Sequence, residues 1–175
     1  MKHYKTKHLL FLLLIALPMA TFAQTLTGKV VKIADGDTFT LLVDGHDQYK
    51  IRLDGIDCPE KRQNFSKKAT QYLSSMIWEQ TVTVKVSTKD RYGRYIGKVS
   101  TPTIADVNLE MIKAGYAWHY KEYNDDPVYA EAEAKAREQK KGLWLEDNPV
   151  YPQDFRKAQR EKNKQKKQNM QSNNH

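Results

Sequence analysis

Three segments between residues 26 and 53 are rich in Val, Ile, Leu and Thr, which predicts strands: residues 26–34, 38–43 and 49–53. Apolar and polar positions alternate in residues 81–87, which predicts a fourth strand, and residues 95–100 are expected to form a fifth that pairs with it. Turn-forming residues at 44–47 separate the second segment from the third, and those at 89–93 separate the fourth from the fifth. The pattern therefore predicts a three-stranded meander and a later hairpin.

Helical periodicity occupies much of the remaining chain. Apolar residues recur three or four positions apart in residues 64–78, which predicts an amphipathic helix directly after the third strand. A second helix is expected from its N-cap, Asp106, to residue 114. A third is expected from Asp126 to the residue before Gly142. We therefore predict an α+β fold, a five-stranded OB-type β-barrel with three helices.

The N-terminal residues follow a different pattern. Residues 1–8 carry three lysines, residues 9–20 are almost wholly apolar, and small residues end the segment at Ala23. This is typical of a secretory signal peptide, and the 12 apolar residues are too few to cross a bilayer, which takes about 20. We expect residues 1–23 to be removed and the mature chain to be periplasmic or extracellular, without a stable membrane span.

The formal net charge of +8 is distributed unevenly. Residues 24–155 hold 19 Lys and Arg against 20 Asp and Glu, whereas residues 156–175 hold seven against one. Net charge thus gives no reason to expect that the folded domain, residues 24–155, binds a polyanion. The tail at 156–175 is rich in Lys, Gln and Asn, and we expect it to be disordered. It would serve either to keep the protein soluble or to attract phosphate.

Acidic residues and arginines gather where the predicted strands end. Asp37 lies at the turn from the first strand to the second, while Asp57 and Glu60 follow the third strand. These carboxylates could form one cluster suited to a hard divalent cation, and the lack of a His/Cys cluster in the sequence argues against zinc. Arg52 and Arg94 would bring two permanent positive charges to the same place. Such a set suits phosphoryl chemistry, in which negative charge builds on phosphate oxygens.

Eight short segments carry recognisable motifs: Ala34–Thr38, Ile51–Leu53, Asp57–Glu60, Asp90–Arg94, Val107–Leu109, Ala114–Ala117, Gly142–Trp144 and Glu146–Pro149. In this order, over residues 26–157, they resemble the staphylococcal nuclease (thermonuclease) family, and ordered agreement is more specific than any single motif. The resemblance implies the OB-type fold and a calcium-dependent nuclease that hydrolyses DNA, RNA or both and leaves 3′-phosphate ends.

The same resemblance implies roles for individual residues. Asp37 and Asp57 are similar in position to the calcium ligands of the family. Cys58 stands where the founding member has a threonine whose backbone carbonyl binds the metal, and as the single cysteine of the chain it can form no internal disulfide. The residues in the positions of the catalytic set are Arg52, Glu60 and Arg94.

Four further residues are candidates for contact with the substrate. Arg91 and Tyr92 precede Arg94 in a loop that could hold a terminal phosphate or could simply be solvated. Trp118 and Tyr120 border the substrate cleft in the resemblance and could stack on a base, but packing at the barrel edge explains them equally well.

Two other functions are compatible with these features. An OB-type module could hold single strands or oligosaccharides without cutting them, with the acidic residues serving structure. An envelope protein could instead bind anions through its basic tail. The complete set of acids and arginines favours the nuclease, which we expect to act as a monomer.

Overall fold

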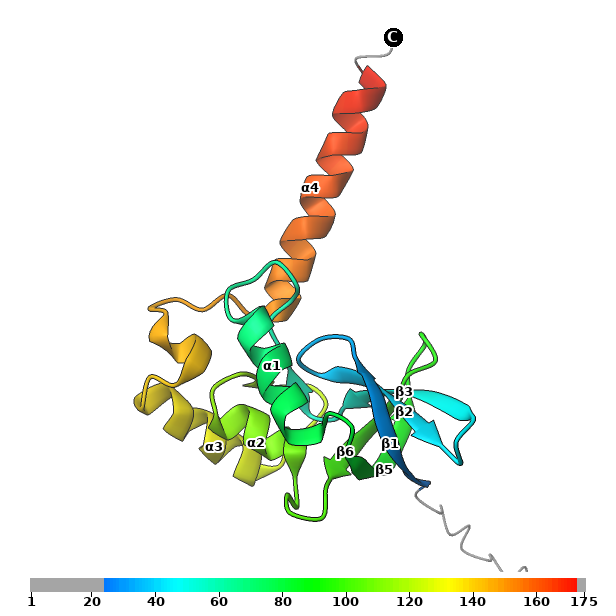
Figure 1. Cartoon of the computed structure of the whole chain (residues 1–175). Coiled ribbons are helices and arrows are strands. Elements are labelled where there is room, and N and C mark those ends of the chain that lie inside the picture. Colours follow the sequence, from blue (N-terminus) through cyan, green and yellow to red (C-terminus); the bar gives the residue numbers. More distant parts are fainter. Residues whose placement is uncertain (1–23, 173–175) are drawn as a thin grey trace, which may run out of the picture.

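The computed structural model describes residues 24–172 and has a closed five-stranded β-barrel with helices beside it (Figure 1). The predicted signal peptide, residues 1–23, lies outside the described residues. The barrel strands are β1 (Thr25–Ile33), β2 (Thr38–Val43), β3 (Asp47–Leu53), β5 (Thr81–Lys89) and β6 (Tyr95–Ser100). Around the barrel they follow the order β1-β2-β3-β6-β5, with β3 and β6 parallel and the other neighbours antiparallel. The prediction of a five-stranded OB-type barrel is confirmed.

The interior of the barrel is filled by alternate residues of each strand, as the two-residue period of a β-strand requires. Residues no more than 1% exposed in these strands are Val30, Phe39, Leu41, Ile51, Leu53, Val82, Val84 and Val99. Burying one such side chain contributes about 1.5–3 kcal/mol, and a shift of register by one residue would turn a whole set outward. The core therefore fixes the register, and the register fixes where polar residues at the strand ends lie.

The three predicted helices are present with slightly different ends: α1 (Ser66–Ile77), α2 (Val107–Lys113) and α3 (Pro127–Glu138). Helix α1 begins at Ser66 because Phe65 has a left-handed φ of 62°, which a helical residue does not adopt. Helix α2 has the predicted cap, since the Asp106 side chain accepts a hydrogen bond from the backbone N of Leu109. A 3₁₀ turn, η1 (Gly142–Leu145), follows α3.

A second, two-stranded sheet lies beside the barrel. Strand β4 (Ile56–Asp57) pairs antiparallel with β7 (Trp118–His119), so that Asp57 is opposite Trp118. The backbone N of Tyr120 extends this pairing by donating to the carbonyl oxygen of Gly55 at 2.9 Å. Strands of two residues are too short to be recognised from sequence periodicity. Their role is to hold Asp57 in place just after β3.

The C-terminal region differs from the expected disordered tail. Residues Pro152–Ser172 form α4, a helix that projects away from the barrel (Figure 1). Its Lys, Arg, Gln, Glu and Ala residues have high intrinsic helix propensity, and proline suits the first turn because that turn needs no N–H from it. The prediction of disorder is wrong for residues 156–172, because a low apolar content does not prevent residues of high propensity from forming a helix.

Two tryptophans have different environments. Trp144 is only 8% exposed, whereas Trp78, at the end of α1, is 46% exposed. Within residues 24–172, none of the helices combines the length and the apolar content needed to cross a membrane.

Candidate active site

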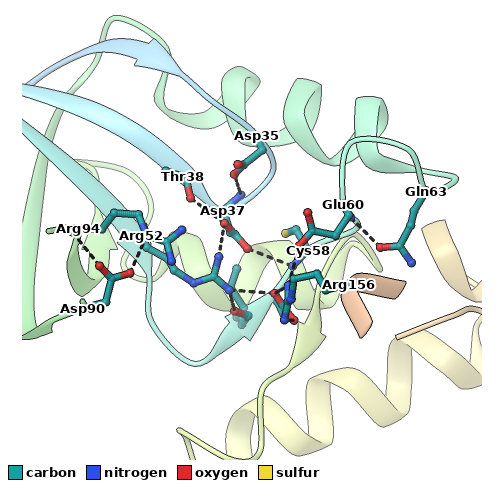
Figure 2. Close-up of polar contacts among 12 residues, drawn as sticks. Asp35, Asp37, Thr38, Arg52, Cys58, Glu60, Gln63, Asp90, Arg94 and Arg156 are labelled. Atoms are coloured by element: carbon teal, nitrogen blue, oxygen red, sulfur yellow. Dashed lines mark hydrogen bonds and ion pairs between the residues drawn. The ribbon is translucent and has the colours of Figure 1, made fainter. Parts of the chain in front are cut away.

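The acidic and basic residues of the predicted site meet at one end of the barrel (Figure 2). Strand register places them there: Arg52 on β3 is paired with Thr38 on β2, the residue next to Asp37. The backbone N of Leu53 donates to the carbonyl oxygen of Asp37 at 2.8 Å. The turn before β2 is therefore fixed against the end of β3.

The turn that carries Asp37 packs too closely for a side chain at its centre. A Cβ atom on Gly36 would lie 2.9 Å from the Cβ atoms of both Ala69 and Cys58. Because real Cβ atoms do not approach so closely, any larger residue would push the turn away from α1 and Cys58. Glycine at this position thus keeps Asp37 within reach of Arg52.

Arg52 bridges the two predicted metal-binding aspartates. Its Nη1 donates to Oδ1 of Asp37 at 2.7 Å, and its Nη2 donates to Oδ1 of Asp57 at 2.9 Å. The three side chains are 15%, 6% and 1% exposed, respectively. Burial alone would lower the pKa of Arg52, but the charges of Asp37 and Asp57 outweigh it and raise that pKa. Arg52 is therefore a permanent cation in a nearly dry site.

Glu60 and Asp57 share a second arginine that the sequence did not point to. Nη1 of Arg156 donates to Oε1 of Glu60 at 2.7 Å, and its Nη2 donates to Oδ2 of Asp57 at 2.9 Å. Burial raises the pKa of the Asp57 carboxyl, and its hydrogen bond from Arg156 opposes that rise. In the sequence, Arg156 opens a run of basic residues with no apolar pattern, which predicts a disordered tail and gives no sign of these contacts.

The segment before Arg156 is docked on the barrel. Nε2 of Gln63 donates to the carbonyl oxygen of Val150 at 2.8 Å, and Pro152 is buried. The ring of Tyr151 packs edge-on against Trp118, with centroids 5.8 Å apart. These contacts hold the first turn of α4 at the site, so Arg156 belongs to the folded domain.

Arg94 lies close by without contacting this cluster. It immediately precedes Tyr95, which is paired with Ile51 on the parallel strand β3. Its Nε donates to Oδ2 of Asp90 at 2.7 Å, and among residues 24–172 its two Nη atoms have no hydrogen-bond partner. Burial alone would raise the pKa of Asp90, but hydrogen bonds from Arg94 outweigh it and lower that pKa. Arg94 is thus held by Asp90 through Nε, and its guanidinium lies 5.8 Å from the centroid of the Tyr92 ring.

The loop before Arg94 carries two of the predicted substrate contacts. Nη2 of Arg91 donates to the hydroxyl of Tyr92 at 2.8 Å, and the Arg91 guanidinium lies 4.9 Å from the centroid of the same ring. Tyr92 is 69% exposed, so both residues lie on the open surface beside Arg94.

The other two predicted contacts have different environments. Trp118 is 4% exposed, and its ring lies 5.5 Å from that of Trp144. A side chain packed in this way cannot stack on a base, so the substrate role suggested for Trp118 is wrong. Tyr120 is half-buried against Tyr123, and burial, together with the nearby charge of Asp57, raises its pKa. Tyr120 is therefore close to the site and partly accessible.

The charges of the site leave room for a divalent cation. In the described part of the chain, Asp37, Asp57 and Glu60 pair with the guanidinium groups of Arg52 and Arg156, and Asp35 accepts from the backbone N of Asp37. Burial, followed by the charge of Asp37, raises the pKa of Asp35 to about 6. With all four carboxylates ionised, the group carries two more negative than positive charges, which a divalent cation would balance.

The donor atoms fit a hard cation such as calcium. Burial raises the pKa of the Cys58 thiol far above its usual value, so the sulfur stays protonated and the backbone carbonyl is the better donor. Asp37 and Asp57 supply carboxylate oxygens. In residues 24–172, no three His, Cys, Asp or Glu side chains already form a metal-binding group. A cation here would therefore take part of its coordination from water or substrate.

Comparisons with known proteins agree with this geometry. The sequence model of the family described as "Staphylococcal nuclease homologue" matches residues 50–146, which is more than half of the chain and includes Arg52, Asp57, Glu60 and Arg94. A protein of Haemophilus influenzae named "Uncharacterized endonuclease" is 41% identical over 134 residues, covering 77% of this chain and 75% of its own. An Escherichia coli protein of the same name is 43% identical over 125 residues, covering 71% and 81%. The protein "Micrococcal nuclease" of Shigella flexneri is 37% identical over 141 residues, covering 75% and 80%.

Proposed function

Because this chain belongs to the staphylococcal nuclease family and is therefore a nuclease, we propose that it is calcium-dependent, acts on DNA, RNA or both, and leaves 3′-phosphate ends. The observation that carries the proposal is the position of Arg52, held between Asp37 and Asp57 beside Glu60. The carboxylates can bind a divalent metal ion, and the buried guanidinium beside them can stabilise the negative charge that builds on a phosphodiester during hydrolysis.

Asp37, Asp57 and the carbonyl of Cys58 would hold the calcium ion. When bound, calcium would draw negative charge from a non-bridging phosphate oxygen. The negative charge of Asp35 next to Asp37 supports a cation at this place, although Asp35 itself is better suited to orienting the turn, since its Oδ1 accepts from the backbone N of Asp37 at 3.2 Å.

Glu60 would accept a proton from the attacking water. Its Oε1 is held by Arg156, while its Oε2 makes no hydrogen bond to any residue in the described part of the chain. The side chain is 37% exposed, so water can reach it. One oxygen is thus positioned and the other is free to take a proton.

Arg52 and Arg94 would stabilise the charge gained by the phosphate in the transition state. A guanidinium has five N–H donors, and Arg52 directs three of them to Asp37, Asp57 and the carbonyl of Ile56. The remaining two can face the substrate. Arg94 can keep Nε on Asp90 while its Nη atoms contact a phosphate oxygen or the leaving 5′-oxygen. Tyr92 and Arg91 would extend this contact to a neighbouring phosphate.

Two further properties belong to the proposal. The proposed catalytic residues all come from one chain, so the protein would act as a monomer. The lysines, apolar run and small residues of positions 1–23 support export through a signal peptide, to the periplasm or beyond it.

The direct experiment uses the protein without residues 1–23. It is incubated with single-stranded DNA, double-stranded DNA and RNA, in calcium or in excess chelator, and the ends released are identified. We expect cleavage in calcium, none in chelator, and 3′-phosphate ends. Binding without cleavage in calcium would instead indicate an OB-type module that holds nucleic acid, and 5′-phosphate ends would refute the proposed bond scission.

A further inference from the structure

Helix α4 starts at the active site and then leaves the body of the protein. Its first turn is docked through Pro152 and Arg156, whereas every described residue from Arg160 to Gln171 is exposed. Figure 1 shows the helix extending well beyond the barrel. An exposed polar helix gains little stability from packing and is only marginally stable by itself. Packing against the core therefore does not explain its composition.

The cations of α4 are not spread evenly around it. Arg156, Arg160, Lys164 and Lys167 follow one another at spacings of four, four and three residues. At 3.6 residues per turn, these four positions fall within an arc of about 80°. We call them the basic stripe. It runs for about 16 Å along the helix axis, at 1.5 Å per residue, and its first member touches Glu60 and Asp57.

Two other lysines of α4 provide a natural contrast. Lys162 and Lys166 are four residues apart and lie on the opposite side of the helix from the stripe. They are exposed, as are Arg160, Lys164 and Lys167 of the stripe. The two sets therefore differ in the direction they face and not in the sign of their charge or in their access to solvent.

The stripe has no internal partner beyond the active site. Among residues 24–172, Arg160, Lys164 and Lys167 make no ion pair with a carboxylate. The only acidic residue after Arg156 in the helix is Glu161, which lies outside the arc. A row of unpaired cations that begins at a phosphodiester site matches a chain of phosphates.

We propose that the basic stripe is a second contact surface for the nucleic-acid substrate, which follows α4 as it leaves the active site. This inference rests on the proposed function, because that function places the cleaved phosphate near Glu60, which Arg156 contacts. A membrane surface fits less well, since the exposed part of α4 has only Met170 as a large apolar residue and no apolar face to insert.

The test compares two double variants that each remove two positive charges. In Arg160→Gln/Lys164→Gln the stripe loses two cations, and in Lys162→Gln/Lys166→Gln the opposite side loses two. Glutamine has nearly the helix propensity of lysine and arginine, so the helix is retained, which circular dichroism checks. Binding is measured in excess chelator, where cleavage is not required, by fluorescence anisotropy of labelled single-stranded DNA of about 20 and about three nucleotides.

For the longer strand, the stripe variant should bind about tenfold more weakly at low salt. Each phosphate that a cation neutralises on a single strand contributes about 0.7 to the slope of log affinity against log salt, so removing two cations should reduce that slope by about 1.4. The opposite-side variant should show a much smaller change, and both variants should bind the short strand as the unsubstituted protein does.

Three results would overturn the proposal: equal effects of the two double variants on the longer strand, an equal loss of affinity for the short strand, or no binding of the longer strand by the unsubstituted protein. If the stripe substitutions weakened binding to anionic phospholipid vesicles more than binding to DNA, the stripe would instead be assigned as a membrane contact. Because these measurements involve no cleavage, a result that refutes the role of the stripe is distinguishable from one that refutes calcium-dependent hydrolysis.

Discussion

Arg156 holds Glu60 through a hydrogen bond of 2.7 Å from Nη1 to Oε1, although the two residues are 96 positions apart in the chain. The same guanidinium contacts Asp57 through Nη2 at 2.9 Å. The proposed base and a proposed metal ligand are therefore joined by a residue from the C-terminal helix. The first turn of α4 is part of the site, and the rest of the helix extends from it.

Replacing Arg156 with glutamine should lower kcat by about tenfold, because Glu60 loses a charge-assisted hydrogen bond that positions it, an interaction of about 1.5–3 kcal/mol. KM for a short substrate should change less. The measurement is steady-state kinetics at saturating calcium, with Lys157→Gln, one position further along the exposed helix, as control. A rise in kcat would mean that Arg156 obstructs Glu60 rather than positioning it.

Removing the charge of Asp37 should strongly reduce the stabilisation of the protein by calcium. Without substrate, calcium at about 100 times its dissociation constant should stabilise the unsubstituted protein by about 2.7 kcal/mol, seen as a rise in Tm. Asp37→Asn keeps an oxygen to accept from the backbone N of Cys58 but should lose most of this rise and nearly all activity. Asp44→Asn, at the other end of β2, removes the same charge and should behave normally. An undiminished calcium response in Asp37→Asn would place the cation elsewhere.

The raised pKa of Asp35 makes stability depend on pH. Folding raises this pKa from 3.8 to about 6, so the folded state binds the proton more tightly and stability falls as pH rises between these values. At 1.36 kcal/mol per pKa unit, the loss is at most about 3 kcal/mol. In chelator, Asp35→Asn should therefore be more stable than the unsubstituted protein at pH 7 and equal to it near pH 3.5. Denaturant titrations at both pH values check this, and a difference that persists unchanged at the lower pH would contradict it.

Arg94→Lys should lower kcat by about a hundredfold. A lysine can pair with Asp90 but cannot keep that pairing and also present two parallel donors to a phosphate. Arg62→Lys, on the exposed loop before α1, is the matched control and should cost little. If both lysine variants retain normal kcat, Arg94 acts only as a structural partner of Asp90.

The sequence was sufficient for the barrel and for bringing Asp37, Asp57 and Arg52 together, but not for the contacts of Arg156. Richness in Val, Ile, Leu and Thr indicated the first three barrel strands, and alternation indicated the fourth, with which the fifth was expected to pair. Asp37 and Arg52 were placed at strand ends whose register then brought them together. The two-residue strands β4 and β7 have too few positions to show a period, so the sequence could not decide between base stacking and packing for Trp118 on β7.

Helix α4 was not predicted, for a different reason. Its residues lack the apolar period that normally indicates a helix, and only the docking of Tyr151 and Pro152 fixes where it starts. Arg156 reaches carboxylates about a hundred positions earlier, and no local pattern encodes such a contact. Its long-range partners become visible only in the folded structure.

The most direct test of the account is the turnover of Glu60→Gln at saturating substrate and calcium. Glutamine keeps the shape and an oxygen that can accept from Arg156, but it cannot take a proton from water, so the rate should fall by about 10²- to 10⁴-fold. Calcium affinity, substrate affinity and Tm should change much less. A folded Glu60→Gln protein with near-normal turnover would contradict the assignment of Glu60 as the base.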